Sequence, residues 1–326
     1  MSRMSLGNNQ VENTVSKRAL RKQARKSRRA EVKNTLVSSY VGGMASNATV
    51  LGFSFTTIPF AKKLPSFSNS LTPSENETVI NGFNKAFNWL GLPKKGITIE
   101  RIAEDAVLED RNGMKGVIDK VVKSEKAKQI LKENIDPIEA IKSGKNAAFE
   151  MINNTIMLPE KKGQLLSFHE MGHALNKVNG KLPALLQKVR NPIGRAGMLL
   201  ASLILFTKKH EIKENPTTRK EKTQNAVGKA VNWTRKAAPW LVALSRVPTI
   251  LEEGLASIKA QKIANKVLSP DLAKKVAKTN MCGFATYLLS AVALGIATKV
   301  GLSVKDHLYE KMSAKRQAKE NQNVAG

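Results

Sequence analysis

The sequence predicts a mainly α-helical fold of the α+β class, and three observations lead to that prediction. Apolar residues recur at helical spacing in several stretches, most clearly at Val79, Phe83, Phe87 and Leu90. Runs that suit a strand are few, and the clearest is Thr155-Ile156-Met157-Leu158, which Pro159 closes. Three further uncharged or apolar stretches follow residue 195, and we interpret them as helices.

Composition narrows the class of partner. The 326 residues suffice for one large domain or two ordinary ones, and the net charge of +28 predicts attraction to polyanions. Aromatic residues make up 5% of the chain and are not interleaved with basic runs, which argues against nucleic-acid binding. We therefore expect an anionic membrane surface as a partner. The single Cys282 leaves any metal site to His and carboxylate ligands.

The first 75 residues form segments that differ in charge. Residues 1–33 form a basic arm with few apolar residues, so we expect disorder or a marginal helix there. Residues 34–61 carry no charge and are long enough to cross a bilayer, yet they are polar for a transmembrane helix. A membrane-surface segment, a re-entrant segment and core packing all remain open. Residues 62–75, rich in Ser, Pro and Asn, are predicted to be a linker, so that 34–75 is one uncharged segment plus linker.

A helix is predicted to follow that linker. Thr72 suits an N-cap, Pro73 the first helical position and Glu75 the third, as in a capping box. Gly91 and Pro93 are the predicted end of this helix. Residues 97–107 are predicted to hold a strand, and residues 114–122 a further helix.

The stretch around His169-Glu170-Met171-Gly172-His173 organises the rest of the chain. Residues four apart lie on one face of a helix, so His169 and His173 can aim their imidazole nitrogens at one point. His-Glu-x-x-His is the zinc-binding pattern of metalloproteases, in which the Glu, here Glu170, is the general base. Gly172 suits a helix that presses closely against a neighbour.

Three segments around the motif carry a resemblance to a known family. Asn146-Ala147, then Thr155 to Leu158, then Leu165-Leu166-Ser167-Phe168 before His169 resemble the gluzincin peptidases. The similar branch holds the CAAX-prenyl protease and the heat-shock membrane protease, and the likeness covers about residues 146–176 plus one later motif. It implies a zincin-like catalytic core with one Zn²⁺ per chain. It also implies that a short β-sheet edge strand before the motif helix binds an extended peptide.

The later motif concerns the third metal ligand, since a catalytic zinc needs three protein ligands plus water. No His-x-x-Gly-x-x-His continuation follows His173, which excludes the metzincin pattern. The family places a Glu at the head of E-x-x-A-D, and Glu253 with Ala256 matches it, while Ser257 replaces the Asp. Glu252 is the rival ligand, but it lies about 100° away around a helix, and register with Ala256 favours Glu253.

The function implied is zinc-dependent peptide-bond hydrolysis by a metalloendopeptidase, with a protein or peptide as substrate. An oxyanion-stabilising residue is usual in such sites, and the candidates are His210, His307, Tyr287 and Tyr309. Two alternatives stay open. One is a zinc-binding protein of the same fold with weak catalysis, as Ser257 suggests. The other is a basic polyanion-binding protein whose His-Glu-x-x-His is fortuitous.

Membrane association rests on the apolar stretches. Residues 196–207 are too short to span, and residues 237–251 are interrupted by Arg246. Residues 279–298 are the one good transmembrane candidate, and a fully buried core helix is the alternative for them. A hairpin of the first two would carry a basic loop across the membrane, against the positive-inside rule, so we expect them in the interface or packed on the core. The prediction is a peptidase domain at 76–278, an apolar helix at 279–300 and a polar tail at 301–326. It places the protein at a membrane, on the cytoplasmic face.

Overall fold

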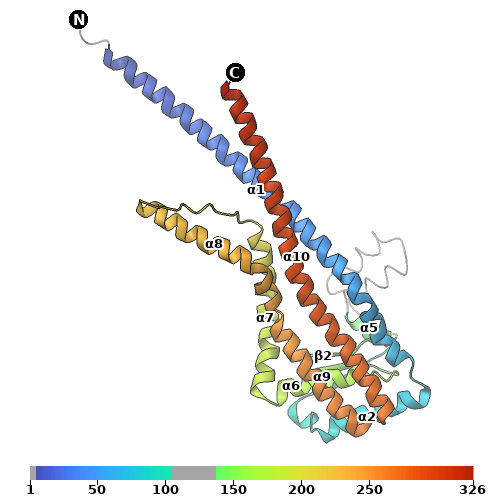
Figure 1. The fold of residues 1–326 in the computed structure, drawn as a ribbon. Coiled ribbons are helices and arrows are strands. Elements are labelled where there is room, and N and C mark those ends of the chain that lie inside the picture. Colours follow the sequence, from blue (N-terminus) through green and yellow to red (C-terminus); the bar gives the residue numbers. More distant parts are fainter. Residues whose placement is uncertain (1–4, 105–136, 326) are drawn as a thin grey trace. The chain divides into compact units, whose positions relative to one another are not determined.

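The computed structural model describes residues 5–104 and 137–325, and it is mainly helical (Figure 1). This confirms the mainly α prediction. The helices and strands, in chain order, are α1 Ser5–Asn69, α2 Pro73–Trp89, the 3-10 turn η1 Pro93–Lys95, β1 Thr98–Ile102, α5 Pro137–Lys142, β2 Ala148–Glu150, β3 Thr155–Pro159, α6 Leu166–Val178, α7 Lys181–Ile204, α8 Arg219–Leu244, α9 Val247–Val267 and α10 Pro270–Ala325. The helix predicted at 114–122 lies outside the described residues.

The chain folds into two compact units that are not consecutive in sequence. The first unit contains Met1–Leu51, Gly197–Val242 and Ala293–Gly326, and the second contains Gly52–Ala196 and Ala243–Val292. Long helices pass from one unit into the other, so charge and hydropathy do not mark the boundaries. The consecutive division at 33, 75, 278 and 300 follows charge and hydropathy, and it stays a prediction.

The terminal helices are longer than predicted. α1 runs through the basic arm and the uncharged segment to Asn69, and α10 continues through the polar tail to Ala325. Of the disorder or marginal helix expected for residues 1–33, the structure has helix from Ser5 onward, and the linker expected at 62–75 is helical as far as Asn69. Near its end α1 is held by tertiary contacts, because the buried Ser68 hydroxyl donates to Gln164 Oε1 and accepts from the Leu165 N–H.

The predicted start and end of α2 are confirmed. Thr72 and Glu75 form a reciprocal capping box, and Pro73 is the first residue of the helix. Gly91 follows the helix with a φ of +63°, a conformation that costs glycine little. The strand predicted within 97–107 is β1.

The second unit contains a three-stranded sheet in the order β1-β3-β2, with β1 parallel and β2 antiparallel to β3. The strand predicted at Thr155–Leu158 is confirmed as β3, and Asn154 forms the turn before it with a φ of 57°. β3 is the central strand, however, so its expected place at the sheet edge was wrong. Its residues pair with Thr98–Ile102, which lie far away in sequence, and no local pattern reveals that pairing.

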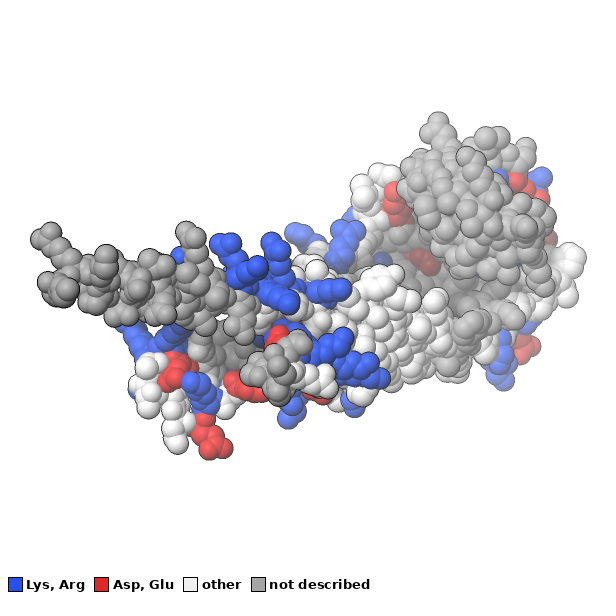
Figure 2. Space-filling model, turned by 90° about the horizontal axis from the view of Figure 1, so that it is seen from above, with Lys and Arg blue, Asp and Glu red and all other residues white. Residues whose placement is uncertain are grey.

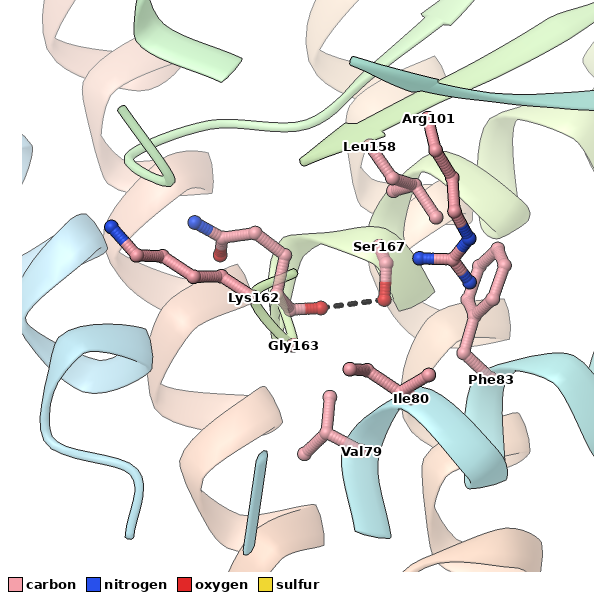
Figure 3. Close-up of a pocket in the computed structure, with 9 residues that line it drawn as sticks. Val79, Ile80, Phe83, Arg101, Leu158, Lys162, Gly163 and Ser167 are labelled. Carbon is pink, nitrogen blue, oxygen red and sulfur yellow. Dashed lines mark hydrogen bonds between the residues drawn. The ribbon is translucent and has the colours of Figure 1, made fainter. Parts of the chain in front are cut away.

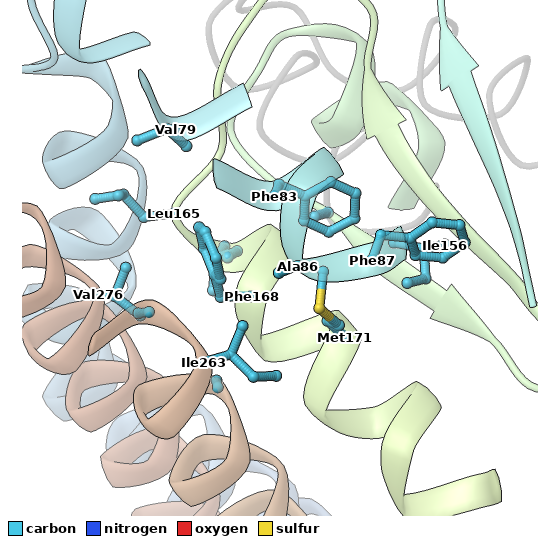
Figure 4. Close-up of a cluster of buried hydrophobic side chains, with 14 of the residues drawn as sticks. Val79, Phe83, Ala86, Phe87, Ile156, Leu165, Phe168, Met171, Ile263 and Val276 are labelled. Carbon is cyan, nitrogen blue, oxygen red and sulfur yellow. The ribbon is translucent and has the colours of Figure 1, made fainter. Parts of the chain in front are cut away.

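The core of the second unit surrounds α6. Figure 4 shows side chains from α2, α6, α9 and α10 meeting in one cluster, with Phe83 and Phe168 among them. The Phe83 and Phe168 rings pack edge to face, with centroids 6.2 Å apart. Because α6 is buried from Leu166 to Asn176, its polar side chains must find partners inside the protein.

The first unit brings parts of α1, α7, α8 and α10 together. Ser39 of α1 donates to the Leu205 carbonyl at 2.6 Å. Gly42 of α1 faces Gly301 of α10 so closely that a Cβ on Gly42 would lie 2.6 Å from the Gly301 carbonyl oxygen. These contacts fix the two long helices to each other within that unit.

Candidate metal centre

The motif helix α6 directs His169 and His173 to a common point. Their Nε2 atoms lie 3.0 Å apart. Glu253 of α9 brings its Oε2 to 3.0 Å from His169 Nε2 and 3.4 Å from His173 Nε2. Ligands bound tetrahedrally at about 2.0–2.1 Å from zinc lie roughly 3.3 Å from one another. The three atoms therefore have the mutual spacing of a tetrahedral ligand set.

Glu252, the rival ligand, is directed elsewhere. Its Oε1 lies 2.8 Å from His173 Nδ1, the ring nitrogen that faces away from the common point. A carboxylate only accepts hydrogen bonds, so this contact fixes the proton on Nδ1 and leaves the Nε2 lone pair for a metal. Glu252 and Glu253 are adjacent on α9, but Glu253 faces the two Nε2 atoms and Glu252 faces His173 Nδ1. The sequence had left the choice between these two residues open.

Several donors hold the fully buried Glu252 carboxylate. Asn176 donates to Oε1 at 3.0 Å, Gln187 donates to the same oxygen at 3.3 Å, and Arg190 donates to Oε2. Arg190 also donates to Glu253 Oε1 at 2.9 Å, which leaves Glu253 Oε2 facing the histidines. Sequence reasoning missed Asn176, Gln187 and Arg190, because polar residues at irregular spacing on α6 and α7 form no recognisable motif.

The charges of this cluster suit a divalent cation. Glu170, Glu252 and Glu253 are buried, and Arg190 is the cation that the described residues place against Glu252 and Glu253. Buried charges are costly unless they are compensated. Three carboxylates and one guanidinium leave a charge of about −2, which a single Zn²⁺ would balance. The donor set of two imidazoles and a carboxylate is also one that zinc prefers.

The pKa values of His173 and Glu253 reflect the electrostatic field of these buried charges. Burial alone would lower the pKa of His173, but the carboxylates of Glu252 and Glu253 raise it to about 10. Burial would raise the pKa of Glu253, and the hydrogen bonds from His169 and His173 reverse this and lower it strongly. The site therefore favours a positive charge at the point where the two histidines meet Glu253.

Glu170 lies beside this point without joining the triangle. Burial raises the pKa of its carboxyl, against the opposing influence of both histidines, and the Phe149 backbone N–H donates to it. Phe149 lies in β2, which forms an edge of the sheet among the described residues. The edge strand beside the motif helix is thus β2, where sequence reasoning had expected Thr155–Leu158.

Ser257 and Tyr287 complete the surroundings. Ser257 Oγ lies 3.3 Å from His169 Nδ1, the position at which the resemblance implies an Asp. Tyr287 of α10 has a hydrogen bond with Glu253. His210, Tyr309 and His307 belong to the first unit, so Tyr287 is the member of that candidate set that the structure brings to the site.

A small cavity lies behind the start of α6. Figure 3 shows Ser167, Leu158, Phe83 and Arg101 around it, and its volume is about 10 Å³. That volume suits about one water molecule. The cavity therefore cannot receive a substrate side chain.

No family model, curated protein or solved structure matches the chain.

Proposed function

We propose that the chain is a zinc metallopeptidase, a hydrolase that acts at or near a membrane. His169, His173 and Glu253 hold one Zn²⁺, and Glu170 is the general base. The observation that carries the proposal is the convergence of three ligand atoms at separations of 3.0–3.4 Å, beside a fourth, acidic side chain. Two neutral imidazoles and one carboxylate leave a coordination position for water, as in catalytic zinc sites.

The bound ion would lower the pKa of water and polarise the scissile carbonyl. Side chains of the protein carry out the remaining steps. Glu170 takes a proton from the attacking water and passes it to the leaving amine, and its raised pKa suits that transfer near neutral pH. The Tyr287 hydroxyl, which has a hydrogen bond with Glu253, would donate to the developing oxyanion. Glu252 and Ser257 orient the two imidazole rings from behind.

Strand β2 supports a peptide as the substrate. Phe149 directs its N–H to Glu170, so in an antiparallel strand its carbonyl points the same way, away from β3. Among the described residues no strand pairs with that side of β2, so an extended peptide can donate a hydrogen bond to the Phe149 carbonyl and pass in front of Glu170.

Membrane association is supported by α10 and by charge. Pro270–Gln322 is long and apolar enough to cross a membrane. Lys and Arg side chains gather on the face that Figure 2 presents, and the net charge is +28. Anionic lipids at the cytoplasmic face of a membrane attract such a surface. The positive-inside rule also places basic segments on the cytoplasmic side.

Zinc content tests the proposal. About one zinc per chain is expected in the wild type, with loss in His169→Ala and Glu253→Gln. Glu252→Gln, the matched control, should retain zinc at about a tenth to a hundredth of the wild-type affinity, since Glu252 orients a ligand without being one. Absence of zinc from metal-replete wild type would end the peptidase proposal and leave the polyanion-binding alternative.

Cleavage is tested separately on an unfolded protein substrate. Glu170→Gln should keep the metal and lose roughly 10²–10⁴-fold in rate. If wild type holds zinc but Glu170→Gln changes no measurable rate, the alternative of a zinc-binding protein with weak catalysis is favoured.

A further inference from the structure

Helix α8 in the first unit buries a face of mixed polarity and exposes its two largest apolar side chains. The residues that α8 buries are Asn225, Gly228, Arg235, Ala238 and Val242. Trp233 and Trp240 are 65% and 72% exposed. A surface helix of a water-soluble protein keeps its large apolar side chains in the stripe that faces the core.

Specific hydrogen bonds hold the polar residues of the buried face inward. Asn225 accepts from the Lys213 N–H at 3.0 Å and donates to the Lys213 carbonyl at 2.7 Å. Asn232 makes the same pair of bonds with the backbone of His210, at 2.9 and 2.8 Å. The segment after α7 therefore pairs with α8 through polar groups, and α8 cannot rotate its tryptophans inward without losing these bonds.

Arg235 adds to the polar contacts between α8 and the segment that follows α7. It donates to the Thr207 carbonyl at 2.6 Å, and its other terminal nitrogen binds both carboxylate oxygens of Asp306 in α10 at 2.5 and 2.6 Å. Arg235 thus satisfies carbonyls that follow α7 while its charge is paired. The outward direction of the opposite face is a fixed property of the unit.

The outward face of α8 carries two tryptophans. Trp233 and Trp240 are seven residues apart, about two helical turns, so they lie on one side of α8. Further exposed apolar side chains elsewhere in the first unit are Val227 and Leu241 of α8, Met198, Leu199 and Leu203 of α7, and Phe206 just beyond it. Trp prefers the boundary between water and lipid, so two exposed tryptophans on one side of a helix mark a membrane-interaction site.

The charge of the protein indicates which partner binds the outward face of α8. Exposed Lys222, Lys229 and Lys236 lie on α8 itself, and the whole chain carries +28. That charge opposes contact with a second copy of the chain and favours an anionic surface. We propose that the outward face of α8 inserts into the headgroup boundary of an anionic bilayer, with Trp233 and Trp240 as its anchors. This inference deepens the membrane association proposed above and does not depend on the metal centre.

Two single-tryptophan proteins test the inference. Trp89→Phe with Trp233→Phe leaves Trp240, and Trp233→Phe with Trp240→Phe leaves Trp89. Trp89 is the matched control, because it is also exposed, at 55%, but lies on α2 of the second unit against Lys266. Each full-length protein is reconstituted with vesicles of phosphatidylcholine and phosphatidylglycerol whose acyl chains carry bromine, a fluorescence quencher.

We expect the bromine-labelled chains to quench Trp240 and to shift its emission to the blue, while Trp89 changes little. Binding to pure phosphatidylcholine should be roughly tenfold weaker or more, because the lysines lose their anionic partners. Vesicle binding without quenching of Trp240 would overturn the inference while leaving attachment through α10 intact. A blue shift that rises with protein concentration and needs no vesicles would overturn it in favour of self-association.

Discussion

Gly172 of α6 lies against the backbone of Ala256 in α9. A Cβ on Gly172 would be 2.2 Å from the Ala256 carbonyl oxygen and 2.9 Å from its Cα. The structure thus confirms that the motif helix needs a small residue where it presses on a neighbour. This approach sets the distance between the helix with the two histidines and the helix with Glu253.

Gly172→Ala should force α6 and α9 apart. We expect a loss of about 1–3 kcal/mol in the free energy of unfolding, from overpacking, together with weaker zinc binding. Denaturant unfolding and chelator competition measure the two effects. Gly52→Ala is the control, because a Cβ there meets nothing within 4 Å in helix α1. It should be neutral or slightly stabilising, and equal losses in both variants would contradict the close approach.

Chelation of zinc should destabilise the second unit selectively. A ligand present at about 100 times its dissociation constant stabilises the folded state by about 2.7 kcal/mol, and its removal reverses this. Thermal unfolding followed through Trp89 in the second unit should shift downward on chelation. Unfolding followed through Trp240 in the first unit should shift less, and equal shifts would show that the metal lies elsewhere or that the units unfold together.

Zinc binding should release a proton. The raised pKa of His173, about 10, means that His173 is protonated in the metal-free protein near pH 7, and the metal must displace that proton. The apparent zinc affinity should therefore fall as the pH falls below this pKa. Titration calorimetry in buffers of different ionisation enthalpy counts the protons. A pH-independent affinity between pH 6 and 9 would contradict the role of His173.

Asp306→Asn should destabilise the first unit while leaving zinc content unchanged. Asp306 is the carboxylate that pairs with the buried Arg235, and Lys305 lies beside it at 3.3 Å. The Asp306 side chain is 32% exposed, so we expect a loss of about 1–3 kcal/mol in the free energy of unfolding, less than for a fully buried ion pair. Unfolding followed through Trp240 should show the loss. The exposed Glu310 gives a control, since Glu310→Gln removes one negative charge from the same helix without touching Arg235.

The sequence alone located the motif, the start of α2, a strand within 97–107 and the strand at 155–158. These predictions depend on patterns within a few residues, such as the Thr72–Glu75 capping box and the spacing of His169 and His173 on one helix face. Local geometry of this kind repeats from protein to protein, so a pattern of residue types is enough to predict it.

Tertiary structure decided the features that join distant parts of the chain. Glu252 and Glu253 are neighbours with the same chemistry, and only the angle at which α9 meets α6 sends one to His173 Nδ1 and the other to the Nε2 atoms. Likewise, β3 is the central strand because residues 98–102 pair with it. Arg190 reaches the Glu252 carboxylate from α7. Such choices depend on packing between segments far apart in sequence, and no single stretch carries the information that fixes them.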